Sequence, residues 1–298
     1  MARFTRALAP LAILGILAAA GCAGGDELSV AEGTKDDPIK LGVVGASDPY
    51  WTIYEKAVED AGIALDIVDF SDYALLNPAL SDGELDINQF QHIQYLADYN
   101  VHNDDDLQPI GATAIYPLGL YSSQYDSVED IPDGATVIVP NDTVNQARGL
   151  LVLQSAGLVS LKDGGNATST LQDIEDGSRV EVKALQADLT VTSLSDAAAA
   201  IINNDFLDAA GLEGGDALIA DDPSDPTALP YVNVFAARSA DVDNETLNEL
   251  VDIYQSTQEV LDSLQEQSGG TAVFSTTPRE DLQASLEETE KAIAALDK

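Results

Sequence analysis

The sequence predicts an α/β protein of two lobes with a ligand cleft between them. Apolar, strand-like runs alternate with helical stretches from Ile39 onward, a rhythm typical of parallel sheets covered by helices. Two long strand-like runs beside loop signals, 110–121 and 231–237, predict where the chain crosses between the lobes. Roughly 260 residues follow the N-terminal segment, which is enough for two modest lobes. Ligands of open α/β sheets bind beyond the strand ends, so the cleft is the expected site.

The individual elements follow from hydrophobic periodicity and from glycine and proline signals. The last expected helix has Thr277 as N-cap, Pro278 at its first position and Glu280 at its third, a capping-box arrangement. The expected strands are 39–45, 65–70, 136–139, 180–185, 198–202 and 232–237, and the expected helices are 50–61, 93–99, 142–156, 245–267 and 278–296.

The N-terminus predicts export. Arg3 and Arg6 form a short basic region before an apolar stretch, 7–20, that is too short for a membrane-spanning helix. The stretch ends in Ala19-Ala20-Gly21-Cys22, which resembles the bacterial lipobox, although the usual leucine is replaced by alanine here. The alternative is an ordinary secretory signal followed by an incidental cysteine.

These signals define the expected organisation of the chain. Residues 1–21 are predicted to be a signal peptide, and Cys22 is predicted to carry the lipid that anchors the protein to the extracytoplasmic face of the cell membrane. Residues 22–38 lack hydrophobic periodicity and are predicted to be a flexible tether. Lobe 1 is expected to comprise 39–118 and 235–298, and lobe 2 to comprise 119–234.

The charge of the chain excludes one class of partner. After removal of the predicted signal peptide, 11 basic residues face 52 acidic ones, a net charge of −41. Such a surface repels nucleic acid, because phosphate binding needs Lys and Arg. We interpret the carboxylates as an adaptation to a salt-rich exterior, where screening is strong. The alternative, a multisite calcium binder, lacks the Asp/Asn/Gly spacing of an EF-hand.

Signatures of catalysis are missing from the sequence. It has no Gly-x-Ser-x-Gly elbow, no Walker loop, no Gly-x-Gly-x-x-Gly after a strand and no His-Glu-x-x-His. The two histidines, His92 and His102, cannot form a multi-histidine metal centre, and a single cysteine excludes an intrachain disulfide or a Cys-based zinc site. We therefore expect neither an enzyme nor a cofactor or metal, although an extracellular enzyme or an acidic adhesin is the alternative of another class.

The sharpest binding signal is the segment 140–148. Asp142 fits the N-cap of a helix that follows a buried strand, which places Asn145 and Arg148 on one helical face. A guanidinium beside a helix N-terminus is suited to binding a carboxylate. The alternative is that Arg148 pairs with a surface Asp or Glu.

Aromatic and amide side chains follow several predicted strands. Tyr73, Phe90 and His92 stand where they can wall a cleft and hold an apolar or thioether side chain. Asn203 and Asn233 place amides at strand ends, where they can accept from an ammonium and donate to a carboxylate. The alternatives are that the rings belong to the core, that the histidine is structural and that the asparagines are plain turn residues.

These segments together resemble the NlpA/MetQ family of lipoproteins, the substrate-binding components of methionine ABC importers. The resemblance is carried by an ordered set of segments over roughly 41–238. They are Asp82-Gly83-Glu84-Leu85-Asp86 with Phe90-Gln91-His92, Tyr116-Pro117-Leu118-Gly119-Leu120-Tyr121-Ser122, Ile131-Pro132-Asp133-Gly134-Ala135, 140–148, Ala200-Ile201-Ile202-Asn203 and Pro230-Tyr231-Val232-Asn233-Val234.

The resemblance implies a type-2 periplasmic-binding fold, whose two lobes close on the ligand and present it to a membrane permease. It implies that Arg148 grips the ligand carboxylate and that three asparagines hold its amino and carboxylate groups. The residues implied to surround the ligand side chain are Tyr73, Phe90, His92 and Tyr116, and the three asparagines are Asn145, Asn203 and Asn233.

Departures from the family pattern lie mainly around the ligand side chain. The tyrosine at 73 is followed by Ala-Leu-Leu-Asn instead of Val-Gln-Pro-Asn, and the first loop, 47–51, is more aromatic than the common form. The expected ligand is L- or D-methionine or a close amino-acid relative. A Met-containing dipeptide, or another small anion on the same fold, is the alternative.

Overall fold

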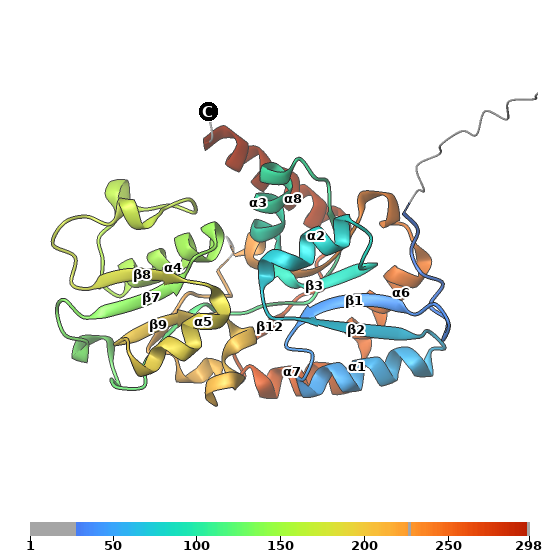
Figure 1. Cartoon of the computed structure of the whole chain (residues 1–298), viewed down its shortest axis with the longest axis horizontal. Helices are drawn as coiled ribbons and strands as arrows, with labels where there is room; N and C mark the ends of the chain where they lie inside the picture. Colours follow the sequence, from blue (N-terminus) through green and yellow to red (C-terminus); the bar gives the residue numbers. More distant parts are fainter. Residues whose placement is uncertain (1–27, 226–227, 297–298) are drawn as a thin grey trace, which may run out of the picture.

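The structure is a computed structural model that describes residues 28–225 and 228–296. The predicted signal peptide and Cys22 lie outside the described residues. Within the described part of the chain, two five-stranded sheets each carry helices on both faces and lie side by side as two lobes (Figure 1). The α/β fold of two lobes is therefore confirmed.

The first sheet has the strand order β2-β1-β3-β11-β4. β1 pairs in parallel with β2 and β3, whereas β11 runs antiparallel to β3 and β4. The bounds are β1 Ile39–Val44, β2 Leu65–Phe70, β3 Ile87–His92, β4 Gln108–Ala112 and β11 Asn233–Ala237. β11 thus begins the return to the first sheet at Asn233, two residues before the expected lobe limit.

Helices cover both faces of this sheet because each presents one apolar side. In α1, for example, Tyr50, Trp51, Tyr54 and Val58 are buried and follow helical spacing. The helices α1, α6 and α7 share one core cluster, and α2, α3 and α8 share another on the opposite face (Figure 1). Their bounds are α1 Pro49–Asp60, α2 Leu76–Ser81, α3 Ile93–Asn103, α6 Glu245–Ser256, α7 Gln258–Gln267 and α8 Arg279–Leu296.

The second sheet has the order β10-β6-β9-β7-β8. β7 pairs in parallel with β8 and β9, and β6 is antiparallel to β9. The helices α4 and α5 pack on its opposite faces. The bounds are β6 Gly119–Tyr121, β7 Thr136–Pro140, β8 Glu181–Leu185, β9 Ala199–Ile202, β10 Ile219–Ala220, α4 Thr143–Ser155 and α5 Ala187–Thr192.

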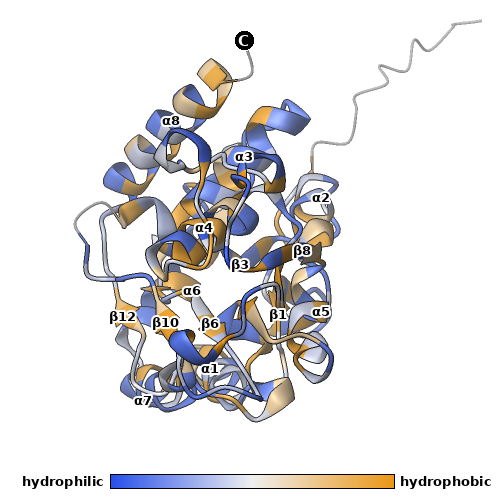
Figure 2. Ribbon diagram, turned by 90° about the vertical axis from the view of Figure 1, so that its left-hand side faces the viewer, coloured by the Kyte–Doolittle hydropathy of each residue, from blue (hydrophilic) through white to orange (hydrophobic). Residues whose placement is uncertain are grey.

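Hydropathy follows this architecture. Figure 2 shows orange along β6 and β10, whereas α8 is banded in both colours, as expected for a helix with one buried side. No helix within residues 28–225 or 228–296 is long and apolar enough to cross a bilayer.

Two of the sequence-based elements were wrong in extent. The apolar run 110–121 is not one strand, because it is divided into β4, the short β5 (Ala114–Ile115) and β6, and Pro117 separates β5 from β6. β5 pairs with β12 (Val273–Phe274). The single helix expected over 245–267 is two helices, because Thr257 adopts an extended conformation and its hydroxyl donates to the Ile253 carbonyl at 2.7 Å.

The described part of the expected tether is docked on the first lobe. Val30 and Ala31 pack against its core, and the Ala31 amide donates to Asp86 Oδ1 at 3.0 Å. The Gly33 carbonyl accepts from the Ala64 amide at 2.7 Å. These contacts hold residues 30–33 in place, so flexibility is not a property of the whole range 22–38.

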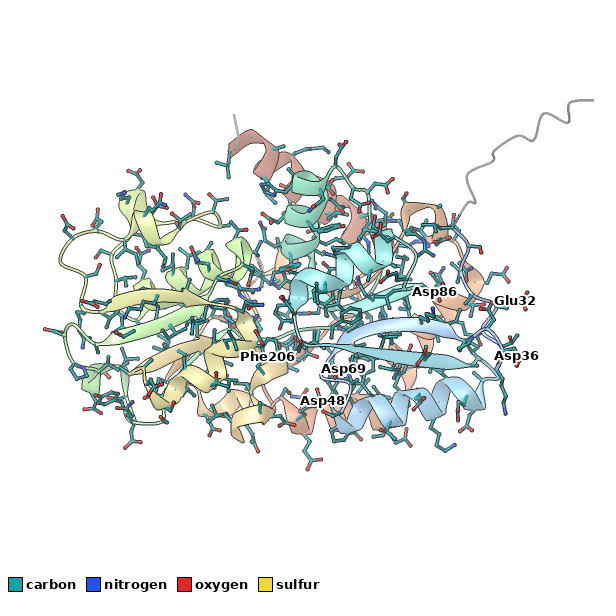
Figure 3. All side chains as sticks on the ribbon, in the orientation of Figure 1. Glu32, Asp36, Asp48, Asp69, Asp86 and Phe206 are labelled. Carbon is teal, nitrogen blue, oxygen red and sulfur yellow. The ribbon has the colours of Figure 1, made fainter. Side chains whose placement is uncertain are left out.

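The two lobes touch across the cleft. One apolar cluster joins Tyr73 and Phe90 of the first lobe to Ile138 and Phe206 of the second. The rings of Tyr73 and Phe206 are 5.3 Å apart, and Figure 3 labels Phe206 at the edge of the second lobe that faces the first. At the rim, Gln186 Nε2 donates to Asp72 Oδ2 at 2.7 Å. The structure therefore shows the lobes closed on each other.

Candidate functional site

A cavity lies between the lobes, and we call it the first cavity. The first lobe contributes the end of β3 and the segment after β2, and the second contributes the start of α4 and the loop after β9. All eight ligand-binding residues expected from the sequence line it. They are Tyr73, Phe90, His92, Tyr116, Asn145, Arg148, Asn203 and Asn233.

The N-terminus of α4 orients Asn145. Asp142 is the N-cap, as predicted, and its Oδ1 accepts from the Asn145 amide at 2.8 Å and from Asn145 Nδ2 at 3.0 Å. This leaves Asn145 Oδ1 as an acceptor for two neighbours: Asn203 Nδ2 at 3.2 Å and His92 Nε2 at 3.4 Å. Asn145 thus links both lobes at the centre of the site.

The His92 ring is held in one tautomer. It caps α3, and its Nδ1 accepts from the Tyr95 amide at 3.1 Å, so the ring proton resides on Nε2 and faces Asn145. Burial, together with the nearby positive charge of Arg148, lowers the pKa of His92 to about 3. His92 is therefore a neutral donor in the site and adds no positive charge.

We expect the imidazole of His92 to stay unprotonated at pH 5, where an ordinary histidine is mostly protonated. The measurement is a two-dimensional NMR titration of the ring nitrogens, with His102→Gln used to assign the two histidines. A midpoint for His92 near pH 6.5 would contradict the buried, neutral ring described above.

Arg148 is buried, with 6% of its surface exposed, and one edge of its guanidinium is occupied. Nε and Nη2 donate to Asp221 at 2.5 and 3.1 Å, and Nη2 also donates to the Tyr116 carbonyl at 2.9 Å. The Tyr231 ring lies under the guanidinium carbon at 4.3 Å. The predicted alternative, a carboxylate partner for Arg148, is therefore present in the structure.

The pairing with Asp221 leaves the other edge of the guanidinium free. Within the described residues, no hydrogen bond is made by Nη1, which carries two N–H donors. Because Asp221 fixes the orientation of the guanidinium, Nη1 can present those donors to a ligand without rearrangement. Arg148 can thus serve a structural partner and a ligand together.

Whereas Arg148 has a free donor, Asn203 has a free acceptor. Its Nδ2 donates to Asn145, but its Oδ1 is buried and has no hydrogen-bond donor among the described residues. A buried acceptor without a partner costs about 1–3 kcal/mol. The Asn203 oxygen is therefore suited to accept from a ligand N–H.

Asn233 begins β11 at the same cavity. Its carbonyl accepts from the amide and hydroxyl of Thr113 at 2.8 and 3.1 Å, so its backbone is fixed beside β4. Within the described chain, its side chain makes no hydrogen bond to the protein although it lines the cavity. It is a second amide available to a ligand.

An aromatic wall closes one side of the first cavity. The Phe90 ring lies 5.6 Å from both Tyr73 and Tyr95, and the edge-on contact with Tyr95 is typical of aromatic packing. Tyr73 donates to Asp205 Oδ2 at 2.6 Å, which ties the wall to the second lobe. Such a wall is suited to an apolar or thioether side chain.

Sequence reasoning missed several residues that line the first cavity. Tyr95 was inside an expected helix, and its position three residues after His92 could have placed it on the same side. Asp205 was hidden among 52 acidic residues, because nothing in its local pattern sets it apart. The missed residues are Gln91, Tyr95, Pro117, Leu118, Asn204 and Asp205.

The charges that line the first cavity are balanced. Arg148 and Asp205 are its charged side chains within the described residues. Burial raises the pKa of Asp205 to about 6, partly offset by hydrogen bonds from Tyr73 and Asn204, so the carboxyl is mostly ionised at neutral pH. One cation and one carboxylate in a closed cavity fit a zwitterion better than a simple anion. No group of three or more potential metal ligands is found in the described part of the chain.

The chain is similar to known proteins over most of its length. The D-methionine-binding lipoprotein MetQ of Salmonella typhimurium is 37% identical over 270 residues, covering 88% of this chain and 94% of the relative. MetQ of Escherichia coli K12 is 36% identical over 270 residues, with the same coverage of 88% and 94%.

Solved structures give the same result. A nutrient-binding protein from Burkholderia cenocepacia bound to methionine has a TM-score of 0.73 and 36% identity, covering 80% of this chain and 99% of that one. Protein PG110 from Staphylococcus aureus has a TM-score of 0.79 and 31% identity, covering 84% of this chain and 99% of that one. The family model described as NlpA lipoprotein matches residues 39–275. This chain therefore belongs to the NlpA lipoprotein family.

Proposed function

We propose that this protein is an extracytoplasmic, lipid-anchored solute-binding protein that binds L- or D-methionine, or a close amino-acid relative, and delivers it to an ABC importer. Its relatives are substrate-binding proteins, and the two described above are named for D-methionine. The Burkholderia cenocepacia structure holds methionine itself. The proposal for this chain rests on those relatives together with its own cavity.

The observation that carries the proposal is a pair of unused polar groups in one closed cavity. Arg148 has a free guanidinium edge, and Asn203 has a buried oxygen without a donor. An α-amino acid satisfies both at once, because its carboxylate accepts from Nη1 while its ammonium donates to the asparagine oxygen. Asp205 adds a negative charge at the ammonium end.

The ligand side chain is then directed to the aromatic wall of Tyr73, Phe90 and Tyr95. A thioether sulfur is polarisable and makes favourable contacts with aromatic rings, each worth about 0.3–1.5 kcal/mol. Tyr116 and His92 complete the enclosure, and His92 does so as a neutral ring. A simple anion such as nitrate or a sulfonate would leave the Asn203 oxygen unpartnered and would face Asp205.

Cys22 has a role in the same mechanism. A lipid on this residue would confine the capture domain to the membrane surface and raise its effective concentration near the permease. Closure of the lobes on the ligand would present both lobes to the permease. We assign no catalytic role to the protein.

The test is mass spectrometry of the small molecules released from protein that was purified natively without its signal segment and Cys22. We expect methionine or a close α-amino acid, at up to one equivalent per chain. Thermal unfolding in the presence of L- and D-methionine is the companion measurement, because a ligand at 100 times its Kd stabilises the folded state by about 2.7 kcal/mol. Release of no such compound, together with no thermal shift, would refute the proposal.

A further inference from the structure

A second cavity lies between the lobes and shares one wall with the first cavity. The first lobe contributes the loop before α1 and the end of α7, and the second lobe contributes β6 and the segment between β9 and β10. Asp48 lies in the first of these walls and Asp205 in the second. Because both lobes form the cavity, it would open to water if the lobes separated.

Two loops that line the second cavity meet without room for a side chain. A Cβ atom added to Gly214 of the second lobe would lie 2.6 Å from the carbonyl oxygen of Ser268 in the first. A Cβ atom added to Gly269 of the first lobe would lie 3.3 Å from the Gly214 amide nitrogen. The loops therefore approach as closely as glycine allows. Asp48, which lines the same cavity, has only 7% of its surface exposed.

The charge in the second cavity is of one sign. Asp48 of the first lobe and Asp205 of the second are its charged lining residues, and no Lys, Arg or His lines it within the described chain. Figure 3 labels Asp48 at the edge of the first lobe that faces Phe206 of the second. Closing the lobes thus places two carboxyl groups in one enclosed space without a cation between them. Such an arrangement raises the free energy of the closed state while both groups are ionised.

Asp205 is the better stabilised of the two as an anion. Its Oδ2 accepts from the Tyr73 hydroxyl at 2.6 Å, and its Oδ1 accepts from Asn204 Nδ2 at 2.9 Å. Asp48 has the Gln267 side chain as a hydrogen-bond partner, and the buried Oε1 of Gln267 has no donor among the described residues. A protonated Asp48 would bring an O–H donor to that side chain. The proton therefore belongs on Asp48.

We propose that Asp48 couples ligand binding to the uptake of a proton, because its carboxyl is ionised while the lobes are open and becomes protonated as they close on the amino acid. The proton comes from the solvent, and the ligand loses none. Asp48 lines the second cavity and not the first, so it acts on affinity through the free energy of closure. This inference rests on the proposed function.

The charged groups that act on Asp48 are all acidic. Burial raises the pKa of Asp48 to about 7, against the hydrogen bond from Gln267. Asp205 and Asp208 of the second lobe, and Asp69 of the first, raise it further. Burial also raises the pKa of each tyrosine hydroxyl in the cavity, so none of them is charged. These tyrosines are Tyr50, Tyr116 and Tyr121.

The expected coupling is larger in acid than in alkali. An exposed aspartate has a pKa of about 3.9, so Asp48 in open lobes is ionised throughout the range from pH 6 to pH 8. With a pKa of about 7 in closed lobes, Asp48 takes up about 0.9 of a proton at pH 6 and about 0.1 at pH 8. The contribution of Asp48 to affinity should therefore fall about tenfold between these two pH values.

The test is isothermal titration of L-methionine into the wild type and Asp48→Asn at pH 6 and pH 8. We expect the affinity of the wild type, relative to the variant, to fall about tenfold from pH 6 to pH 8. The variant should bind more tightly than the wild type at pH 8. Three other groups in the site titrate with shifted pKa values, but they are present in both proteins and cancel in the ratio. They are His92, Asp142 and Asp205.

Asp36→Asn is the matched control, because it removes the same charge from an exposed position. Figure 3 labels Asp36 at the edge of the first lobe that lies away from the second. This variant should keep the pH dependence of the wild type, which separates the effect of Asp48 from that of net charge.

Infrared difference spectroscopy follows the proton in the wild type, so it remains decisive even if Asp48→Asn folds poorly. Adding L-methionine at pH 7 should produce the band of a protonated carboxyl, which should be much weaker at pH 8. Burial raises the pKa of Asp142 and Asp205 to about 6, so both remain mostly ionised at pH 7 and contribute little to this band.

The outcomes separate the two claims. Methionine binding with the same pH dependence in the wild type and Asp48→Asn, or without a protonated-carboxyl band at pH 7, would overturn the coupling and leave the proposed function intact. Weaker binding by Asp48→Asn than by the wild type at pH 8 would also overturn the coupling. Absence of methionine binding by the wild type at both pH values would refute the proposed function itself.

Discussion

Replacing Arg148 by methionine is expected to weaken methionine binding by about two to three orders of magnitude. Arg148 is the cationic side chain of the first cavity, because His92 is held neutral by burial. Truncating one partner of a buried, hydrogen-bonded charge pair costs about 2–5 kcal/mol. The ligand carboxylate would lose Nη1 and meet an apolar side chain in its place. Isothermal titration with L- and D-methionine measures the loss.

Two further variants separate ligand recognition from the pairing with Asp221. Arg148→Lys keeps the charge but has no fork that can serve Asp221 and a ligand together, so we expect a clear loss of affinity in this variant as well. Asp221→Asn keeps the guanidinium, and its effect should be much smaller than that of either arginine variant. Near-normal affinity in Arg148→Met would refute the assignment of the carboxylate anchor.

The second large effect is expected on stability, at the amide network behind β3. Asn77 is 1% exposed and forms two hydrogen bonds with Gln91. Asn77 Nδ2 donates to Gln91 Oε1 at 2.7 Å, and Gln91 Nε2 donates to Asn77 Oδ1 at 2.6 Å. The same Oδ1 accepts from Asn88 Nδ2 at 3.0 Å. Asn77→Leu leaves two buried amides short of partners, and each such group costs about 1–3 kcal/mol. We expect the free energy of unfolding to fall by about 2–5 kcal/mol.

Urea unfolding of the ligand-free protein, followed by circular dichroism, measures this loss. The matched control is Gln258→Leu, because Gln258 is an exposed amide that donates to Asp262 at 2.8 Å, and its replacement should change stability by about 0.5 kcal/mol or less. A loss for Asn77→Leu no larger than that of the control would show that the network contributes little.

The network also satisfies two of the four polar side chains of β3, a strand that is buried on all six residues. Asn88 and Gln91 satisfy each other and Asn77, and Gln91 lines the first cavity between Phe90 and His92. Disturbing this network should therefore alter the aromatic wall and the histidine as well as the stability. The residues that line the ligand site are thus held by a buried network of amide hydrogen bonds, at a place where apolar packing is the usual arrangement.

Local sequence signals were sufficient for much of the site. The Asp142 cap fixes where α4 begins, and helical geometry then places Asn145 and Arg148 on one face. Strand ends and the family resemblance named the other six expected residues, all of which line the first cavity. Their roles toward a ligand remain predictions that the variants above test.

Long-range contacts could not be predicted from the sequence. Asp221 is 73 residues from its partner Arg148, and 52 acidic residues offer many equivalent candidates. Asp205 was missed for the same reason. The break at Thr257 was missed because one hydroxyl–carbonyl bond interrupts a helical pattern that is otherwise continuous. The docking of Val30 and Ala31 depends on a core surface that exists only in the folded lobe.

The central claim is that the first cavity recognises both ends of an α-amino acid. Its most direct test is a titration of ligand-free protein with L- and D-methionine, with 4-(methylthio)butanoate, which lacks the ammonium, and with 3-(methylthio)propylamine, which lacks the carboxylate. We predict saturable binding of methionine at one site per chain and a loss of at least about 100-fold for each analogue, or about 2.7 kcal/mol. Binding of either analogue with the affinity of methionine would contradict the claim.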